Sequence, residues 1–286
     1  MGDTQDVNCN KCGAPLKIPF GTSVLTCGYC GSSMTVGGAG DQWSDIQKHT
    51  MLVNAIAADQ ASEIAQKWMD EGLFRSGVAR NSTITDIKLQ YIPYWVMPIR
   101  CRTEFTGTAG TGIAGLRNAA GGAKGGNIGS MLGGILNAGI SAKYGGGPQQ
   151  VSRAIDKTYD WPIIAIRGLE NYVVDNYQFI VAQKQLFDPG KLGNPESILN
   201  GDVTESEAKQ KAQGSICAFQ EAEAKSQLDV LSSINSKTKT EAGELLHAAI
   251  WFVKYRLNDK DYFILIDGSN GKIIKGERPA YSLNRD

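Results

Sequence analysis

The chain has 286 residues, and its 29 basic residues are balanced by 29 acidic ones. This length is more than a small metal-binding motif needs, so further domains with hydrophobic cores of their own must follow. Proteins that act mainly on nucleic acid usually carry a basic excess. The neutral balance therefore disfavours nucleic acid as the main partner.

Four of the six cysteines form two closely spaced pairs near the start of the chain: Cys9 with Cys12, and Cys27 with Cys30. Two residues between cysteines let one turn direct both sulfurs at a single point, and two such turns supply the four thiolates that Zn²⁺ prefers. We predict one structural Zn²⁺ with all four cysteines as ligands. Such a closed site has no position for a catalytic water.

Two disulfides, or a redox C-x-x-C motif, are the alternatives for these cysteines. Disulfides need a secretory route, and the first residues of the chain are acidic, without the apolar core of a signal peptide. A redox motif would not be expected as a spaced pair. Cys101 and Cys217 stand alone in apolar surroundings and are predicted to be core thiols, which implies a reducing, cytoplasmic setting.

The residues around the four cysteines predict a zinc ribbon over residues 1–36. Residues 15–18 and 23–26 are expected to form short strands around a turn at Phe20-Gly21. Glycines next to or within the cysteine pairs, at positions 13, 28 and 31, are expected to adopt positive φ so that backbone amides turn toward the sulfurs.

Residues 37–83 are predicted to be a helical region that follows a glycine-rich link. Apolar residues recur at helical spacing from Trp43 to Met69, as one helix or as two helices broken near Ala58-Asp59. His49 lies in this stretch, and we expect it to be a packing or surface residue rather than a ligand.

Residues 84–286 are predicted to be an antiparallel α+β body. Alternation over 84–106 indicates one long, half-buried strand, which Pro93 and Pro98 should confine to a sheet edge, a strand entry or a bulge. The aromatic run 91–95 is expected to anchor the core rather than to form a binding platform. Further strands are predicted over 159–167 and 172–181.

The end of the chain predicts a long helix and then a β-hairpin meander. Thr204 and Glu207 form a capping box at the start of the helix. Alternating residues from Ala249 to Ile274 contain turn signals at 258–260 and 267–272, and the second turn lacks the later acidic ligand of a calcium loop. The fold class is therefore α+β, with an N-terminal zinc ribbon, a helical segment and a β-rich body.

Residues 107–147 interrupt this body and hold 15 of the 34 glycines, with no acidic residue. On a helix, the glycines repeated every four positions, Gly121, Gly125, Gly129 and Gly133, would allow close helix packing in lipid. Flanking basic residues would suit an anionic membrane surface. A flexible or self-associating loop is the other interpretation, because glycine costs a helix about 1 kcal/mol per residue relative to alanine. A phosphate-binding loop is disfavoured, since no G-K-[ST] follows a predicted strand.

Three stretches carry a family resemblance: C-G-A-P-L and C-G-Y-C-G in the ribbon, Y-I-P-Y-W at 91–95, and the hairpin from Trp251 to Ile274. Their order resembles prokaryotic zinc-ribbon proteins labelled TFIIB-type or primosomal helicase-like. The C-terminal part is similar to the PepSY family, in which a helix packs on a hairpin that ends in a D-x-x-x-G-K turn. The helicase label implies a P-loop and acidic motor motifs, which this sequence lacks. Some relatives are associated with envelope-stress systems, as partners of membrane-bound scaffolds.

Nothing in the sequence predicts an enzyme, because the two histidines lie far apart, G-x-S-x-G is absent and the metal site is closed. We predict an interaction or scaffold protein with a protein partner, self-association, or contact with a membrane surface from the cytoplasmic side. The alternative is a nucleic-acid-binding accessory factor that acts through the ribbon. Lys11, Lys17 and Tyr29 are the candidate contacts in that case.

Overall fold

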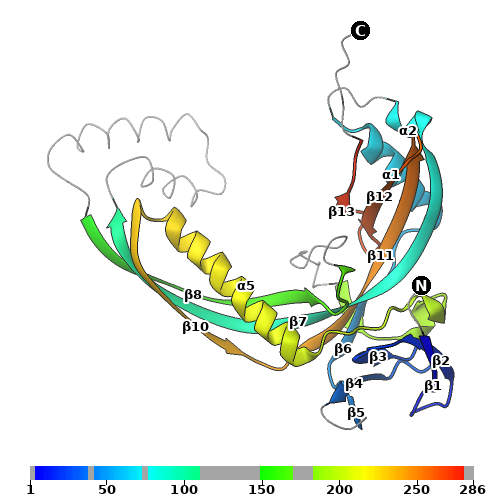
Figure 1. Ribbon diagram of the computed structural model, residues 1–286, viewed down its shortest axis with the longest axis horizontal. Coiled ribbons are helices and arrows are strands. Elements are labelled where there is room, and N and C mark those ends of the chain that lie inside the picture. The colour runs from blue at the N-terminus through cyan, green and yellow to red at the C-terminus, as the bar shows by residue number, and fades with distance from the viewer. Residues whose placement is uncertain (1–3, 38–41, 73–76, 110–148, 170–182, 280–286) are drawn as a thin grey trace. The chain divides into compact units, whose positions relative to one another are not determined.

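The computed structural model describes residues 4–37, 42–72, 77–109, 149–169 and 183–279 (Figure 1). Helices and strands are mixed, and antiparallel pairing predominates, which confirms the α+β fold class. The chain divides into two compact units: unit 1 is Met1–Met97, Trp161–Gln210 and Ala242–Asp286, and unit 2 is Pro98–Asp160 and Lys211–Glu241.

The first strands of unit 1 flank the two turns that carry the four cysteines. β1 (Thr4–Asn8) pairs with β2 (Pro15–Pro19), and β3 (Val24–Thr26), β4 (Ser33–Gly37) and β5 (Gln42–Asp45) form a second antiparallel sheet (Figure 1). We call residues 4–37 the four-cysteine module. The two strands predicted around the Phe20-Gly21 turn are present, but they belong to different sheets. A small core of Ile18, Leu25 and Met34 packs between them.

The predicted helical region is wrong for its first part. Residues 42–45 form β5, and His49–Leu52 form β6, which pairs parallel with β11 and antiparallel with β9 (Lys184–Leu186). Helix α1 begins only at Ala58, ends at Asp70, and is followed by the short α2 (Val78–Asn81). Strand pairing overrides the helix-like spacing of these residues: β5 pairs with the preceding β4, and β6 pairs with β9 and β11 far along the chain.

The main sheet of unit 1 runs in the order β7 (Thr83–Ala109), β11 (Glu244–Leu257), β12 (Lys260–Asp267), β13 (Ile273–Gly276), with antiparallel neighbours. Asn258 and Asp259 join β11 to β12 with φ of 50° and 60°. Positive φ at both residues is the requirement of a tight two-residue hairpin turn. The predicted C-terminal meander is confirmed.

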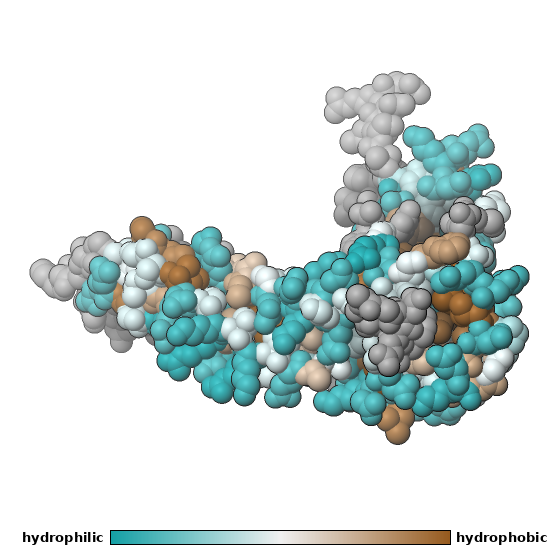
Figure 2. Space-filling view, turned by 60° about the horizontal axis from the view of Figure 1, so that its bottom comes forward, coloured by the Kyte–Doolittle hydropathy of each residue, from teal (hydrophilic) through white to brown (hydrophobic). Residues whose placement is uncertain are grey.

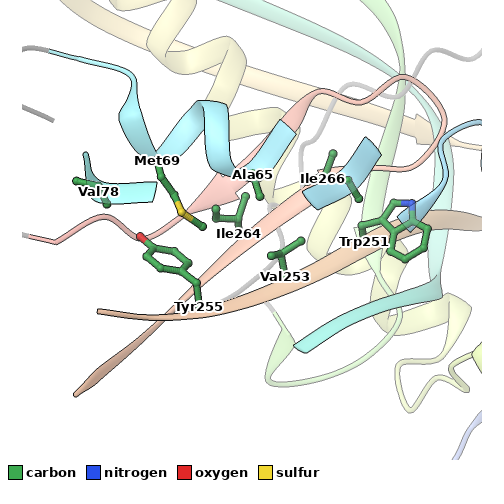
Figure 3. Close-up of a cluster of buried hydrophobic side chains, with 9 residues drawn as sticks. Ala65, Met69, Val78, Trp251, Val253, Tyr255, Ile264 and Ile266 are labelled. Carbon is green, nitrogen blue, oxygen red and sulfur yellow. The ribbon is translucent and has the colours of Figure 1, made fainter. Parts of the chain in front are cut away.

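Helix α1 packs its apolar face on strands β11 and β12 (Figure 3). Ala61, Ala65 and Met69 are buried on the helix and meet Val253 and Ile264 of the sheet. The two alanines leave room for the strand side chains, so helix and sheet approach closely. Among the described residues, this cluster is one of the two larger apolar cores of unit 1.

Strand β7 holds the predicted aromatic run in its middle, and Tyr91, Tyr94 and Trp95 are all buried. Pro93 lies opposite His247 in the regular register of β7 with β11, and therefore not at a bulge. Pro98 lies between Val96, where the pairing with β11 ends, and Ile99, where the pairing with β10 begins, so it stands outside both regular registers. The proline carbonyls still accept hydrogen bonds, Pro93 from the Ala165 amide at 2.9 Å and Pro98 from the Glu241 amide at 3.1 Å. A missing N–H is thus tolerated without loss of the strand.

Unit 2 contains the distal part of β7, most of β8 (Gln149–Ile164), β10 (Val230–Thr240) and most of α5 (Glu205–Ser226). Phe105, Ile155 and Leu228 contribute to its core. The buried Gln220 amide donates to the Cys101 carbonyl and to the Tyr159 hydroxyl, both at 3.1 Å.

The capping box is present, because the Thr204 amide donates to the Glu207 carboxylate at 2.9 Å and the Glu207 amide donates to the Thr204 hydroxyl at 3.3 Å. Cys101 is buried as predicted, whereas Cys217 is half-buried.

Two predicted stretches lie outside the described residues: the strand over 172–181, and the glycine-rich row of Gly121, Gly125, Gly129 and Gly133. The first three residues of the predicted glycine-rich segment, 107–109, belong to β7. Within the described ranges, no helix is both long and apolar enough to span a bilayer.

Two leucines of unit 1 allow a matched test of this core. Leu265 on β12 is fully buried, whereas Leu186 at the end of β9 is 80% exposed. We expect Leu265→Ala to lower the free energy of unfolding by about 2–5 kcal/mol, because it leaves a cavity. Leu186→Ala should change it by less than about 0.5 kcal/mol. Urea unfolding followed by circular dichroism measures both, and equal effects would contradict the described core.

Candidate metal centre and the groove beside it

Two turns of the same construction carry the four cysteines. In the first turn, the Cys9 amide donates to the Ala14 carbonyl at 2.9 Å and the Gly13 amide donates to the Cys9 carbonyl at 2.8 Å. The same two bonds recur in the second turn, from Cys27 to Ser32 and from Gly31 to Cys27, both at 2.9 Å. Gly13 and Gly31 have φ of 75°, so positive φ is confirmed at these two positions.

The sulfurs of the two turns converge. The Sγ atoms of Cys9 and Cys30 are 3.7 Å apart, those of Cys12 and Cys27 are 3.8 Å apart, and all four lie within 4.8 Å of one another. All four cysteines are free thiols. A tetrahedral site with metal–sulfur bonds of about 2.3 Å has sulfur–sulfur edges of about 3.8 Å. The four cysteines therefore fit a metal site.

Hydrogen bonds and burial shift the pKa values of these thiols in different directions. Burial raises the pKa of Cys27 to about 12. Burial also raises the pKa of Cys9, but hydrogen bonds from the Cys12 amide and the Ser32 hydroxyl outweigh it and bring that pKa to about 6. Four adjacent thiolates repel one another, so a bound cation is what would allow all four to ionise together.

Gly28 serves a purpose other than the predicted one. It does not have positive φ, and a Cβ at this position would lie 2.5 Å from the Pro195 carbonyl oxygen. Asn10 occupies the equivalent place in the first turn. The second turn thus needs glycine because the chain at residue 195 packs directly against it.

The segment 198–201 joins the four-cysteine module to the main sheet. The Gly201 carbonyl accepts from the amides of Ser23 and Val24, at 2.8 and 2.9 Å, and the Gly201 amide donates to the Val24 carbonyl at 2.8 Å. On the sheet side, the Leu199 amide donates to the Tyr91 carbonyl at 3.0 Å. The module is therefore hydrogen-bonded, through this segment, to the longest strand of the sheet.

A chain of buried and half-buried polar side chains makes a second connection. The Thr26 and Ser33 hydroxyls are 2.7 Å apart, and Ser33 Oγ is 2.9 Å from His49 Nδ1. His49 Nε2 is in turn 2.9 Å from Nδ1 of His247, which is fully buried on β11. Phe187 stacks on His49 with ring centroids 4.0 Å apart. The two histidines of the chain are thus direct partners.

This pairing was missed from the sequence. The histidines are 198 residues apart, and neither has a local pattern that marks it as a partner of the other. Burial lowers the pKa of His49 to about 4. Burial, and then the neighbouring His49, lower the pKa of His247. Both side chains are therefore held neutral at physiological pH. The ion pair of Lys184 with Glu244, 2.7 Å long, lies on the neighbouring parts of β9 and β11.

A groove of about 660 Å³ lies beside the second cysteine turn. Lys17 and Tyr29, two of the predicted contact residues, both line it. Lys11 does not line it and instead pairs with Asp45 at 3.0 Å. The opposite wall comes from residues 195–200. The structure therefore brings together two of the three predicted contacts.

Comparisons with known proteins identify no relative of this chain. No family model matches the chain, and neither a curated protein nor a solved structure matches it.

We predict that the histidine pair makes the stability of the fold sensitive to acid. Unfolded histidine takes up a proton near pH 6.5, whereas the folded pair resists protonation down to about pH 4 for His49. Below pH 6.5 the unfolded state binds more protons, so the free energy of unfolding should fall as the pH falls, by on the order of 2 kcal/mol toward pH 4. Urea unfolding at a series of pH values measures this decline.

The control for this prediction is the double variant His49→Gln with His247→Asn, which has no histidine left because the chain contains two. It keeps the cysteines and carboxylates, whose protonation also affects stability in acid. Its free energy of unfolding should decline less steeply between pH 6.5 and 4 than that of the wild type. Parallel curves for the two proteins would refute a role of the pair.

Proposed function

We propose that the four-cysteine module is a zinc ribbon with one structural Zn²⁺, and that the protein is a non-enzymatic interaction protein that binds another protein through this ribbon. The observation that carries the proposal is the convergence of four free cysteine sulfurs, with cross-turn distances of 3.7 and 3.8 Å. Thiolate ligands favour Zn²⁺ among the common divalent ions.

A four-thiolate site supports a structural role for the metal. All positions of a tetrahedral ion would be taken by Cys9, Cys12, Cys27 and Cys30, so no water would be bound for hydrolysis. Zinc would fix the turn Cys27–Cys30 and, with it, Tyr29, which lies between two ligands. Metal binding would thus fix the part of the protein surface that carries Tyr29.

Exposed aromatic side chains support a surface that binds a partner. Tyr29 is 56% exposed and Phe20, at the turn after β2, is 65% exposed. Large aromatic residues contribute much of the free energy of protein association. On the face shown in Figure 2, hydrophobic residues form small separate groups among hydrophilic ones, which suits recognition by a few anchoring side chains.

Nucleic acid is the alternative partner, since Tyr29 and Lys17 line one groove and could contact a base and a phosphate. Two carboxylates, Asp6 and Glu196, line the same groove, and Lys11 is paired with Asp45. These charges favour protein over nucleic acid. Self-association and membrane contact through the glycine-rich segment stay predictions, because the glycines that suggest them lie outside the described residues.

Metal analysis tests the ribbon. We expect one zinc per chain in protein purified under reducing conditions, and its loss in Cys12→Ser, because three thiolates bind zinc more weakly than four. Cys217→Ser is the matched control, since this half-buried cysteine lies outside the cluster and its replacement should leave the zinc content unchanged. Wild-type protein without zinc would contradict the proposal.

Crosslinking in native lysate tests the interaction. A partner bound through the ribbon should crosslink to wild-type protein, and the yield should fall in Cys12→Ser and in Tyr29→Ala. Leu186→Ala removes another exposed hydrophobic side chain, 80% accessible, and should leave the yield unchanged. Capture that weakens steeply with salt and disappears after nuclease treatment would favour nucleic acid instead. Equal capture by all variants would rule out the ribbon as the binding surface.

A further inference from the structure

The groove beside the second cysteine turn has two walls of different origin. One wall comes from the four-cysteine module and the other from the segment that precedes the junction with the main sheet. The lining residues are Asp6, Val7, Asn8, Pro15, Leu16, Lys17, Thr26, Gly28, Tyr29, Pro195, Glu196, Ile198 and Asn200. Its volume of about 660 Å³ is in the range of ligand-binding pockets, about 300–1,000 Å³.

Fixed contacts hold the two walls together. The Thr26 amide donates to the Asn200 side-chain oxygen at 2.9 Å, and Gly28 lies directly against Pro195. Asn194 shapes the far wall, since its side chain accepts from the Glu196 amide at 2.9 Å. The groove is therefore preformed, and a ligand would not have to order it.

The near wall of the groove is formed by two β-strands. Its near wall includes residues 6–8 of β1 and 15–17 of β2, which form a two-stranded sheet. Each of these strands has only one neighbour among the described strands. A strand with a free edge can pair with an extended peptide through main-chain hydrogen bonds.

The charges and apolar groups of the groove indicate which peptide fits. Asp6, Lys17 and Glu196 are exposed, and none of the three forms an ion pair within the described residues. Two carboxylates against one ammonium give the groove a net negative charge, which attracts a basic side chain and repels phosphate. Ile198 and the exposed ring of Tyr29 supply an apolar surface beside these charges.

We propose that this groove binds an extended peptide segment of a protein partner, and that the segment carries a basic side chain next to an apolar one. The inference rests on the proposed function and names the chemistry of the partner. The basic side chain lies near Asp6 and Glu196, the apolar one packs on Tyr29 and Ile198, and the peptide backbone runs beside β1 and β2.

Selection from a phage-displayed library of random heptapeptides on full-length, zinc-loaded protein tests the proposal. Enriched sequences should contain lysine or arginine next to an apolar residue. Synthetic, fluorescein-labelled copies should bind in a fluorescence anisotropy titration. No enrichment, a preference for acidic peptides, or tighter binding of a twelve-nucleotide single-stranded DNA probe would overturn it.

Two charge reversals locate the binding site. Glu196→Lys should weaken the selected basic peptides by about tenfold, because it reverses the charge of the groove wall. Glu63→Lys on the exposed face of α1 changes the net charge equally and should leave the affinity unchanged. Equal affinities for the two variants would overturn the groove as the site.

Two controls separate an effect on folding from an effect on peptide binding. The zinc content of both variants, and of Tyr29→Ala, should equal that of the wild type, so that a loss of affinity reports on the groove rather than on the fold. Tyr29→Ala should weaken the peptide by about tenfold or more, as loss of an aromatic anchor does. If no peptide binds while ribbon-dependent crosslinking to a partner persists, this inference fails and the proposed function stands.

Discussion

Repulsion among four sulfur groups is the constraint on which the first part of the molecule depends. Their atoms lie within 4.8 Å of one another, and burial alone would keep the Cys27 thiol protonated. A dication reverses this preference, because it binds thiolates and neutralises their mutual repulsion. The apolar core of the module is Ile18, Leu25 and Met34, with Val7 and Leu16 at its side. Such a core is too small to fold the module alone, so metal binding would supply much of its stability.

The module is also tied to the sheet by two different kinds of contact. The backbone bonds of Gly201 with Val24 align strands, whereas the side-chain contacts from Ser33 through His49 to His247 bury polar groups. Burying a polar group costs free energy unless the group is hydrogen-bonded. This second connection therefore favours the one arrangement of module and sheet in which its polar groups are paired. The two together specify how the module sits within unit 1.

The sequence was most informative where the chemistry is local. The cysteine spacing, the capping box of Thr204 with Glu207, and the turn at Asn258-Asp259 each depend on residues a few positions apart, and the structure contains all three geometries. Apolar alternation likewise located β7 and the C-terminal meander.

Features that depend on distant partners could not be predicted in this way. Strand β6 is a strand because it pairs with β11 and β9, and its own residues are compatible with a helix. His49 became a partner of His247 through the same pairing. Gly28 illustrates the point within the four-cysteine module, since the residue that requires glycine there is Pro195, which lies far from the cysteine motif in the sequence.

On the proposed function, the position of Tyr29 would couple metal binding to partner binding. It lies between Cys27 and Cys30, so an ion bound by these cysteines would stabilise the turn that carries this wall of the groove. A partner that binds this wall would therefore bind the metal-loaded form more tightly than the metal-free form. By reciprocity it would raise the affinity for the metal by the same factor. On the proposed function, a structural ion would in this way raise the affinity of the protein for its partner.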